Sequence, residues 1–310
     1  MRRVDSIRIG SAIGVVNVSA VAANFNNAKF LHDFFRSWMD STVIPRELIF
    51  VDDGSDDDSL DIARSYLDVL PYLVIIPLER NVGFGNALNI GIERASGMYI
   101  LRIDPDDVLM PERLIKQCAV LDAGEADVVG SNAIIFQSQS GTIVGMTNFP
   151  RSHRDIEPVI RRGEHGVLHP TVMARAALFK SNAYIQANVP AEDYDIFARM
   201  LCAGARFHNI QAPLLRYRIH QRSASNALPY STIQKTYSIR DEIFGVHTSR
   251  CMVFFYYLHI KFYRKYLFAS GKILKIFYLG LASALRPDKA AKRLLRAIGT
   301  NQGRTIHEDH

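Results

Sequence analysis

Two clusters of carboxylates in this chain directly follow short apolar runs, a placement that suits metal and nucleotide chemistry. The more acidic one is Asp104-Pro105-Asp106-Asp107, after the run 98–103. Carboxylates this close repel one another, so a fold keeps them together only with a compensating cation or in a well-solvated turn. The cluster therefore predicts either a site where Mg²⁺ or Mn²⁺ bridges a diphosphate or an acidic turn that begins the next helix.

The second cluster, Asp52-Asp53-Gly54-Ser55, follows the apolar run 48–51. One interpretation is that Asp53 accepts a hydrogen bond from the N–H of a nucleobase. The other is a turn closed by its own side chains before a helix. Both interpretations place the cluster at the end of a strand.

Segment 81–89 opens a helix with two glycines and three asparagines. Glycines let the backbone approach a phosphate or a ribose closely, so Asn81 and Gly83 are candidates for donor contacts, although glycine-rich helix starts also occur for packing reasons. The spacing fits neither a Walker A loop nor a GxGxxG dinucleotide motif.

Three further places carry acid–base or cationic groups. Glu192 and Asp193 begin a predicted helix, where acids commonly stabilise the helix dipole, but Asp193 could also take a proton from an acceptor hydroxyl. His169, and Arg218 within Arg216–His220, lie either in structural loops or facing a diphosphate.

The elements that must position these side chains alternate between apolar runs and amphipathic stretches. We expect strands at 15–25, 48–51, 73–78, 98–103 and 128–136, and helices at 30–39, 59–67, 86–94, 111–121 and 191–203. Continuous apolar strands separated by helices indicate a mostly parallel sheet covered on both faces, and ligands bind such sheets at the carboxyl ends of the strands. The acidic clusters and Asn24-Phe25-Asn26 fall at those ends.

Bulk properties exclude several classes of protein. The 310 residues allow one large α/β domain, alone or with an appendage, and 48% hydrophobic with 22% charged residues is ordinary for a folded protein. Three scattered cysteines favour a reducing compartment over a disulfide framework or a zinc site. The N-terminus superficially resembles a signal peptide, but Asp5, Arg8 and Asn17 interrupt its apolar stretch, which favours a buried strand.

The net charge of +6 is unevenly distributed. Eleven Lys or Arg and one acid lie between 250 and 296, so this stretch carries +10 and the rest of the chain −4. Its apolar segments, Cys251–Ile260 and Ile273–Leu285, are too short to span a bilayer. They predict helices that lie in a membrane interface or, alternatively, a helical subdomain packed on the main domain.

The order of the motifs resembles that of the family 2 glycosyltransferases, which have the GT-A fold. The matching segments are Val18–Val21 with Asn24–Asn27, Val51–Ser55, Asn81–Gly83 with Ala87 and Asn89, Ala95–Ile100, Asp104–Asp107, Met110-Pro111 with Arg113-Leu114, His169-Pro170, Glu192–Asp195, and Tyr217-Arg218 with Ser225. The resemblance covers about residues 17–226. It implies a GT-A domain over 1–225, with a nucleotide-binding half over about 17–110 and an acceptor half over 111–225. A helical, basic and aromatic membrane-surface extension follows over 226–310.

The resemblance also implies roles for matched positions. Asp53 binds the nucleobase, in a pocket completed by the following donor-binding positions: Ala23, Phe25, Asn26, Asn81 and Gly83. Asp104 and Asp106 form the metal-binding DxD pair, with Asp106 the direct ligand of Mn²⁺ or Mg²⁺ and Asp104 also a donor contact. Asp193 is the catalytic base, and His169 and Arg218 contact the diphosphate or the acceptor.

The implied activity is inverting transfer of one sugar from a nucleotide-sugar, by default a UDP-sugar, to a hydroxyl of a glycan or lipid-linked glycan in cell-envelope or exopolysaccharide biosynthesis. The QxxRW motif of processive family members is absent, and Trp38 is the only tryptophan. Ala22-Ala23 stands where the family commonly has a proline. The expected location is cytoplasmic, at the inner face of the membrane.

Two alternatives come from other classes. A sugar nucleotidyltransferase shares the nucleotide-binding domain and the metal, but it has a Gly-rich basic loop after the first strand that 24–28 does not match. A non-catalytic protein could bind a membrane or nucleic acid through its tail. The aromatic and aliphatic content of the tail suits a lipid interface better, so we expect no nucleic-acid partner.

Overall fold

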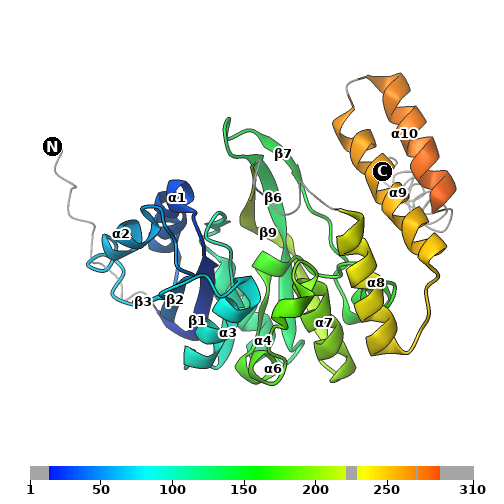
Figure 1. The fold of residues 1–310 in the computed structure, drawn as a ribbon. Coiled ribbons are helices and arrows are strands. Elements are labelled where there is room, and N and C mark those ends of the chain that lie inside the picture. Colours follow the sequence, from blue (N-terminus) through cyan, green and yellow to red (C-terminus); the bar gives the residue numbers. More distant parts are fainter. Residues whose placement is uncertain (1–13, 221–228, 270, 287–310) are drawn as a thin grey trace, which may run out of the picture. The chain divides into compact units, whose positions relative to one another are not determined.

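The computed structural model describes residues 14–220, 229–269 and 271–286 (Figure 1). The chain divides into two compact units, Met1–Ala227 and Leu228–His310, which are treated separately below as the N-terminal and C-terminal units. Ser225, the charged residues before position 14 and most of the basic cluster 286–296 lie outside the described residues.

The first half of the N-terminal unit is a parallel sheet. Its strands are β1 (Val15–Asn24), β2 (Ile44–Asp52), β3 (Leu73–Pro77) and β4 (Tyr99–Arg102), in the spatial order β3-β2-β1-β4. Helices α1 (Ala28–Met39), α2 (Ser59–Arg64) and α3 (Phe84–Arg94) connect them. Asn24 pairs with Asp52 in register, so the polar ends of β1 and β2 lie side by side as expected.

The second half extends this sheet to nine strands. β8 (Met173–Arg175) pairs antiparallel with β4, and β6 (Val128–Gln137) lies next to β8 and parallel to β9 (Phe207–Ile219). β5 (Val108–Leu109), which follows the acidic turn, pairs with the far end of β9. β7 (Ile143–Met146) forms a hairpin with β6. The α/β fold with a mostly parallel first half and flanking helices confirms the predicted class.

The unit also contains four further α-helices and two 3₁₀ turns in its described part. They are α4 (Arg113–Asp122), α5 (His153–Arg161), α6 (Ala176–Ser181) and α7 (Glu192–Cys202), with 3₁₀ turns at His169–Thr171 and Gln186–Asn188. The helix predicted from position 111 begins at Arg113, and the helix predicted at 191–203 is α7.

Both faces of the parallel strands are buried, which explains their uninterrupted apolar sequences. Alternate residues of β1, such as Ala20 and Ala22, face a core that includes Phe34, Phe35 and Trp38 of α1. The other face receives α3, which approaches so closely that a β-carbon at Gly91 would lie 2.6 Å from Cγ1 of Val21. Because helices cover both faces of the parallel strands, a ligand can reach the sheet at the carboxyl ends of the strands.

The C-terminal unit consists, in its described part, of α8 (Tyr230–Phe244), α9 (Arg250–Phe268) and α10 (Lys272–Leu285). The two predicted apolar segments lie in α9 and α10, which pack side by side (Figure 1). Its core is small, built on Ile233, Tyr237 and Val253, and Nδ1 of the buried His259 lies 2.7 Å from the Ala282 carbonyl oxygen. Among the described residues, no helix combines the length and apolar character needed to cross a membrane.

Candidate active site

The turn after β1 is held by a polar network with the turn after β2. Nδ2 of Asn24 donates to Oδ1 of Asp52 (2.8 Å), and the Ser55 hydroxyl donates to the same carboxylate (2.7 Å). The Ser55 hydroxyl oxygen also accepts a hydrogen bond from the backbone amide of Asn26. Asn26 has a left-handed φ of 56°. Asparagine tolerates that conformation better than most residues, which accounts for its place in the turn. Phe25 is left 46% exposed at this edge.

Asp53 is buried and holds the loop that precedes α3. Its two carboxylate oxygens accept the backbone amides of Val82 (2.7 Å) and Gly83 (3.0 Å). Gly54 makes the approach possible, because it has a φ of 68° and a β-carbon there would lie 2.6 Å from the Arg80 carbonyl carbon. Asp53, Asn81 and Gly83, predicted from separate motifs, are therefore one structural unit. Each oxygen of Asp53 retains a lone pair for a further donor.

The start of α3 also contacts a segment that is distant in sequence. Oε1 of Gln186 accepts the amides of Gly85 (2.8 Å) and Asn86 (3.3 Å). Gly83 makes space for the Gln186 side chain, since a β-carbon at position 83 would collide with the side-chain amide of Gln186. Gln186 is not predictable from the sequence, because nothing local marks a glutamine as the cap of a helix a hundred residues earlier.

Asp104 forms a close ion pair with a buried arginine from its own strand. Nη2 of Arg102 lies 2.5 Å from Oδ1 of Asp104 and Nη1 lies 2.7 Å from Oδ2. Burial raises the pKa of the Asp104 carboxyl, with further increases from Asp106 and Asp193, while Arg102 acts in the opposite direction. The site thus holds more carboxylate charge than Arg102 alone neutralises.

The next two acids are tied to the end of β9. Oδ2 of Asp106 lies 2.9 Å from Nε2 of His220, and the Asp106 carbonyl accepts Nε of Arg218 (2.6 Å). Asp107 accepts the Arg218 amide through Oδ1 (2.8 Å). Arg218 also pairs with Asp33 of α1 through Nη2 (2.8 Å). Of the basic segment 216–220, for which a loop was one of two interpretations, residues 216–219 belong to β9, and the segment lies directly against the acidic turn.

The three aspartates could hold a metal ion. Asp104, Asp106 and Asp107 each offer a carboxylate oxygen, and these oxygens lie within 4.8 Å of one another. Oδ2 of Asp107 is buried and has no hydrogen-bond partner among the described residues. Burial and the neighbouring Asp106 and Asp104 raise the pKa of Asp107 well above its usual range. A hard cation with oxygen ligands would compensate this charge, so the donor set fits Mg²⁺ or Mn²⁺.

Glu192 and Asp193, at the start of α7, interact electrostatically with this turn although they are distant from it in sequence. Oδ1 of Asp193 accepts the Tyr194 amide (2.7 Å), and Oδ2 lies 3.4 Å from Nδ1 of His165. Burial, followed by the charge of Asp193, raises the pKa of Glu192 to about 7, and Asp104 contributes to the increase. Carboxylates 89 positions apart therefore share one electrostatic environment. One quarter of the Asp193 side chain is exposed.

His169 is buried on the inner side of this region. Its Nε2 lies 2.6 Å from the Tyr184 hydroxyl, and its ring packs edge-on against Phe197. Burial and the nearby charge of Arg102 keep its pKa well below the usual range, so the ring is neutral at physiological pH. Because the ring is enclosed by aromatic groups, its direct contacts are with protein side chains.

The chain has the architecture of the GT-A class: the carboxyl ends of its parallel strands are open, a loop held by Asp53 precedes α3, and an acidic turn follows β4. The family model for glycosyl transferase family 2 matches residues 19–182, and the chain belongs to that family. It is a glycosyltransferase.

Individual relatives agree with this assignment. The chain is 31% identical over 189 residues to the amylovoran biosynthesis glycosyltransferase AmsE of Erwinia amylovora, covering 61% of this chain and 70% of AmsE. The fold matches S. aureus TarS 1-349 in complex with UDP-GlcNAc, at a TM-score of 0.59 and 20% identity, over 88% of this chain and 82% of TarS 1-349. It also matches the mannosyltransferase PcManGT of Pyrobaculum calidifontis in complex with GDP-Man and Mn²⁺, at a TM-score of 0.56 and 15% identity, over 94% and 81% of the two chains.

Proposed function

We propose that this glycosyltransferase moves one sugar, with inversion, from a nucleotide-sugar to a hydroxyl of a glycan or lipid-linked glycan acceptor in cell-envelope or exopolysaccharide biosynthesis. The observation that carries the proposal is the convergence of the acidic turn 104–107 with Asp193, whose charge raises the pKa of Asp104. A charge-binding group for the leaving diphosphate and a base for the acceptor are both needed in such a transfer. The relationship to AmsE supports a glycan as the acceptor.

The nucleotide is proposed to bind at the ends of β1 and β2. Asp53 accepts the imide N–H of a uracil, while the backbone at Ala23 and Phe25 and the side chain of Asn26 line the same space. Exposed Phe25 offers an aromatic face there. Asn81 and Gly83, held by Asp53, contact the ribose and phosphates. UDP is the proposed nucleotide, and TarS 1-349 with UDP-GlcNAc has this fold.

Asp104 and Asp106 are proposed to hold Mn²⁺ or Mg²⁺. When bound, the ion offsets the charge that develops on the leaving diphosphate. Asp106 is the direct ligand, and His220, 2.9 Å from it, either joins the ion or fixes the orientation of the carboxylate. Arg102 holds Asp104 in place, Arg218 fixes the turn from β9, and His169 supports the site from behind through Tyr184.

Asp193 is proposed to deprotonate the acceptor hydroxyl. It is partly exposed, as a base that meets an incoming acceptor must be, and His165 lies within 3.4 Å to stabilise its charge. The hydroxyl oxygen attacks the anomeric carbon from the face opposite the nucleotide. A single displacement then gives a β-linked product from an α-linked donor.

The C-terminal unit is proposed to rest on the inner face of the cytoplasmic membrane. Lys272 and Lys275 flank apolar side chains of α10 that face solvent, and Ile273 is 85% exposed. Basic groups beside exposed apolar groups suit an anionic lipid surface. A lipid-linked acceptor would be presented at that surface.

The test is donor binding and cleavage across UDP-, GDP- and dTDP-sugars with Mn²⁺ or Mg²⁺. We expect one donor to be cleaved slowly and only with metal. Asp106→Ala should reduce this cleavage by about 10²–10³-fold, as expected when electrostatic stabilisation of a leaving group is lost. Asp193→Ala should reduce transfer to an added acceptor by about 10²–10⁴-fold while nucleotide binding survives.

The matched control is Asp68→Ala, which removes an exposed acid of the N-terminal unit and should leave both activities unchanged. If wild type binds none of these donors, or if Asp106→Ala cleaves as fast as wild type, the proposed function is wrong.

A further inference from the structure

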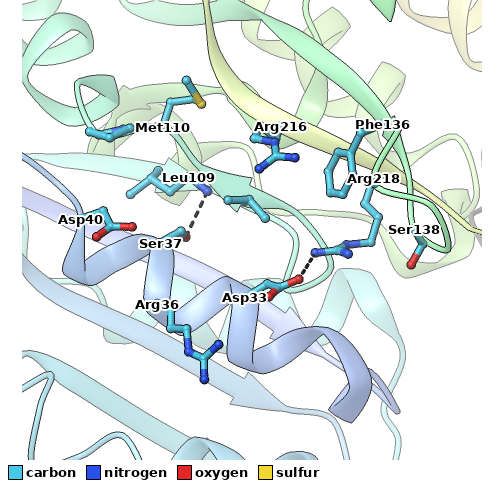
Figure 2. Close-up of a pocket in the computed structure, with 13 residues that line it drawn as sticks. Asp33, Arg36, Ser37, Asp40, Leu109, Met110, Phe136, Ser138, Arg216 and Arg218 are labelled. Atoms are coloured by element: carbon cyan, nitrogen blue, oxygen red, sulfur yellow. Dashed lines mark hydrogen bonds and ion pairs between the residues drawn. The ribbon is translucent and has the colours of Figure 1, made fainter. Parts of the chain in front are cut away.

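A pocket of about 450 Å³ lies between α1, the segment 108–111 and the end of β9 (Figure 2). All of its lining belongs to the N-terminal unit. Its volume is in the range of small-molecule sites. None of the residues predicted for the donor lines it except Arg218, so it is a separate cavity beside the acidic turn.

Three arginines and two aspartates line this pocket, but their charges are used unequally. Arg218 is fully engaged: it pairs with Asp33, donates to the Asp106 carbonyl, and its guanidinium packs against the rings of Phe30 and Phe136. The Asp33 charge is compensated by the same contact. The other charged groups that line the pocket are Arg216, Arg36 and Asp40.

Arg216 is the remaining charged group whose guanidinium faces the pocket (Figure 2). Its guanidinium lies 4.7 Å from the centre of the Phe136 ring, and across the described ranges it has no hydrogen-bond or ion-pair partner. Stacking on a ring uses the face of a guanidinium and leaves its in-plane N–H groups free. Figure 2 shows these groups projecting into the pocket. A half-buried cation that has lost part of its hydration without gaining an anion is a strong position for an anionic ligand.

The surroundings of Arg216 favour an oxyanion attached to a sugar. Arg36 lines the pocket from the exposed side of α1, and Figure 2 shows its guanidinium directed away from Arg216. Ser138 and Asp40 offer hydroxyl and carboxylate groups for sugar hydroxyls, and Asp40 lies away from Arg216 and Arg218 (Figure 2). Leu109 and Met110 provide an apolar wall. Carboxylates and phosphates both match the two parallel N–H bonds of a guanidinium.

We propose that this pocket binds a carboxylate- or phosphate-bearing group of the acceptor through Arg216. The inference rests on the proposed function, because it names the chemistry of the acceptor. Its location supports an acceptor group, because Arg218 forms the pocket wall and the same residue holds Asp106 and Asp107 of the acidic turn. The bound anion would tether the acceptor next to the reaction centre.

The experiment is an NMR titration of the full chain at constant ionic strength and without divalent metal, so that no metal-bound anion contributes. The probes are inorganic phosphate, glucuronate and, as the neutral sugar, glucose. We expect wild type to bind one or both anions saturably and at least tenfold more tightly than glucose. If only glucuronate binds, the acceptor group recognised by the pocket carries a carboxylate. If only phosphate binds, that group carries a phosphate.

Arg216→Gln should weaken anion binding at least tenfold, and Arg216→Lys, which keeps the charge but loses the fork of N–H groups, should weaken it less. Arg154→Gln removes an exposed arginine of α5 and should leave binding unchanged. Thermal unfolding checks that each variant is folded.

The pocket proposal is overturned if neither anion binds, or if Arg216→Gln and Arg154→Gln bind alike. Because the titration needs no donor and no turnover, its failure is distinct from failure of the proposed function, which the donor-cleavage assay reports.

Discussion

Single side chains in the active site carry charges that the fold keeps close together, and Glu192 is the clearest example. Its Oε2 is buried without a hydrogen-bond partner among the described residues, and burial with the charge of Asp193 raises its pKa to about 7 from an ordinary value of 4.5. Because the folded-state pKa is raised, the folded protein gains stability from protonated Glu192. That contribution is fully present below about pH 4.5 and is lost as pH rises through about 7.

Glu192→Gln mimics the protonated carboxyl and should therefore make the metal-free protein more stable than wild type at pH 8. The difference should be at most about 3 kcal/mol, since one pKa unit corresponds to roughly 1.4 kcal/mol, and it should vanish near pH 4.5. Urea unfolding across this pH range measures it. Glu93→Gln, an exposed acid on α3, is the control. Equal curves for Glu192→Gln and wild type at pH 8 would contradict the prediction.

The raised pKa values of Asp104 and Asp107 predict competition between protons and metal. Both carboxyls hold protons to higher pH than usual in the metal-free protein, mainly because they are buried, and a metal ion must displace those protons. The apparent Kd for Mn²⁺ should therefore rise as pH falls from 8 to 5.5, by up to about tenfold per pH unit for each proton displaced. Calorimetric titration measures both the Kd and the proton release. A Kd independent of pH would rule out this account of the site.

Secondary-structure elements set how closely these groups can approach. Helix α3 packs close to the sheet because Gly91 has no side chain at the point of contact. At Gly91 a β-carbon would lie 2.6 Å from Cγ1 of Val21 and 3.2 Å from Cγ2 of Val51. Gly91→Ala gains about 1 kcal/mol of helix propensity but overpacks two stiff β-branched side chains, which costs roughly 1–3 kcal/mol. We expect net destabilisation of up to about 2 kcal/mol in urea unfolding.

A double-mutant cycle identifies the cause of that destabilisation. Val21→Ala removes the methyl group that the added β-carbon would meet, so the cost of Gly91→Ala should shrink in the Val21→Ala background. An unchanged cost in both backgrounds would show that the contact with Val21 is not the source of the strain.

Helix α4 is tied to two other elements through one buried amide. Nε2 of Gln117 donates to the Val129 carbonyl of β6 (2.8 Å) and to the Thr171 carbonyl (2.7 Å), and its Oε1 accepts Nε of buried Arg113 (3.0 Å). Gln117→Leu leaves these groups unsatisfied and should cost about 2–4 kcal/mol in chemical unfolding. Lys116→Leu alters the neighbouring, more exposed position and should cost less than about 1 kcal/mol. Similar losses in both variants would contradict the role given to the amide.

How far the sequence predicts this fold depends on how local each contact is. Strands β1 to β4 and the helices between them follow from apolar runs, and their carboxyl ends coincide because parallel strands linked by helices share one edge. That placed the turns at Asp53 and Asp104 correctly. β5 pairs with β9 across more than a hundred residues, and no local pattern specifies that pairing.

The contacts that depend on such long-range pairing could not be predicted. His220 beside Asp106 is one of them, and Gln186 at the start of α3 is another. β7 follows a turn rich in Ser, Gln and Gly, and α8 has no strong apolar periodicity, so no local pattern predicts either element. The roles of all the predicted site residues, Ala23, Phe25, Asn26, Asp53, Asn81, Gly83, Asp104, Asp106, His169, Asp193 and Arg218, remain predictions, and the donor experiments test Asp106 and Asp193 directly.

The molecule as a whole combines a catalytic unit with a helical unit whose surface is unusually apolar. Ile273, Ile276 and Phe277 share one side of α10, at helical spacing, and each is more than half exposed. Exposed apolar groups at adjacent helical positions need a partner surface, and the interleaved Lys272 and Lys275 favour an anionic one. The proposed membrane contact therefore makes a direct prediction for the full chain.

The full-length protein should cosediment with vesicles that contain phosphatidylglycerol, should do so less with pure phosphatidylcholine, and should release as salt is raised. The double variant Ile276→Ser/Phe277→Ser should bind at least about tenfold more weakly, because each apolar side chain that enters the interface contributes roughly 1–2 kcal/mol. Leu67→Ser changes an exposed apolar residue of the N-terminal unit and should bind like wild type. If the double variant binds as tightly as wild type, α10 does not carry the membrane contact, and a partner protein becomes the better explanation for its apolar side.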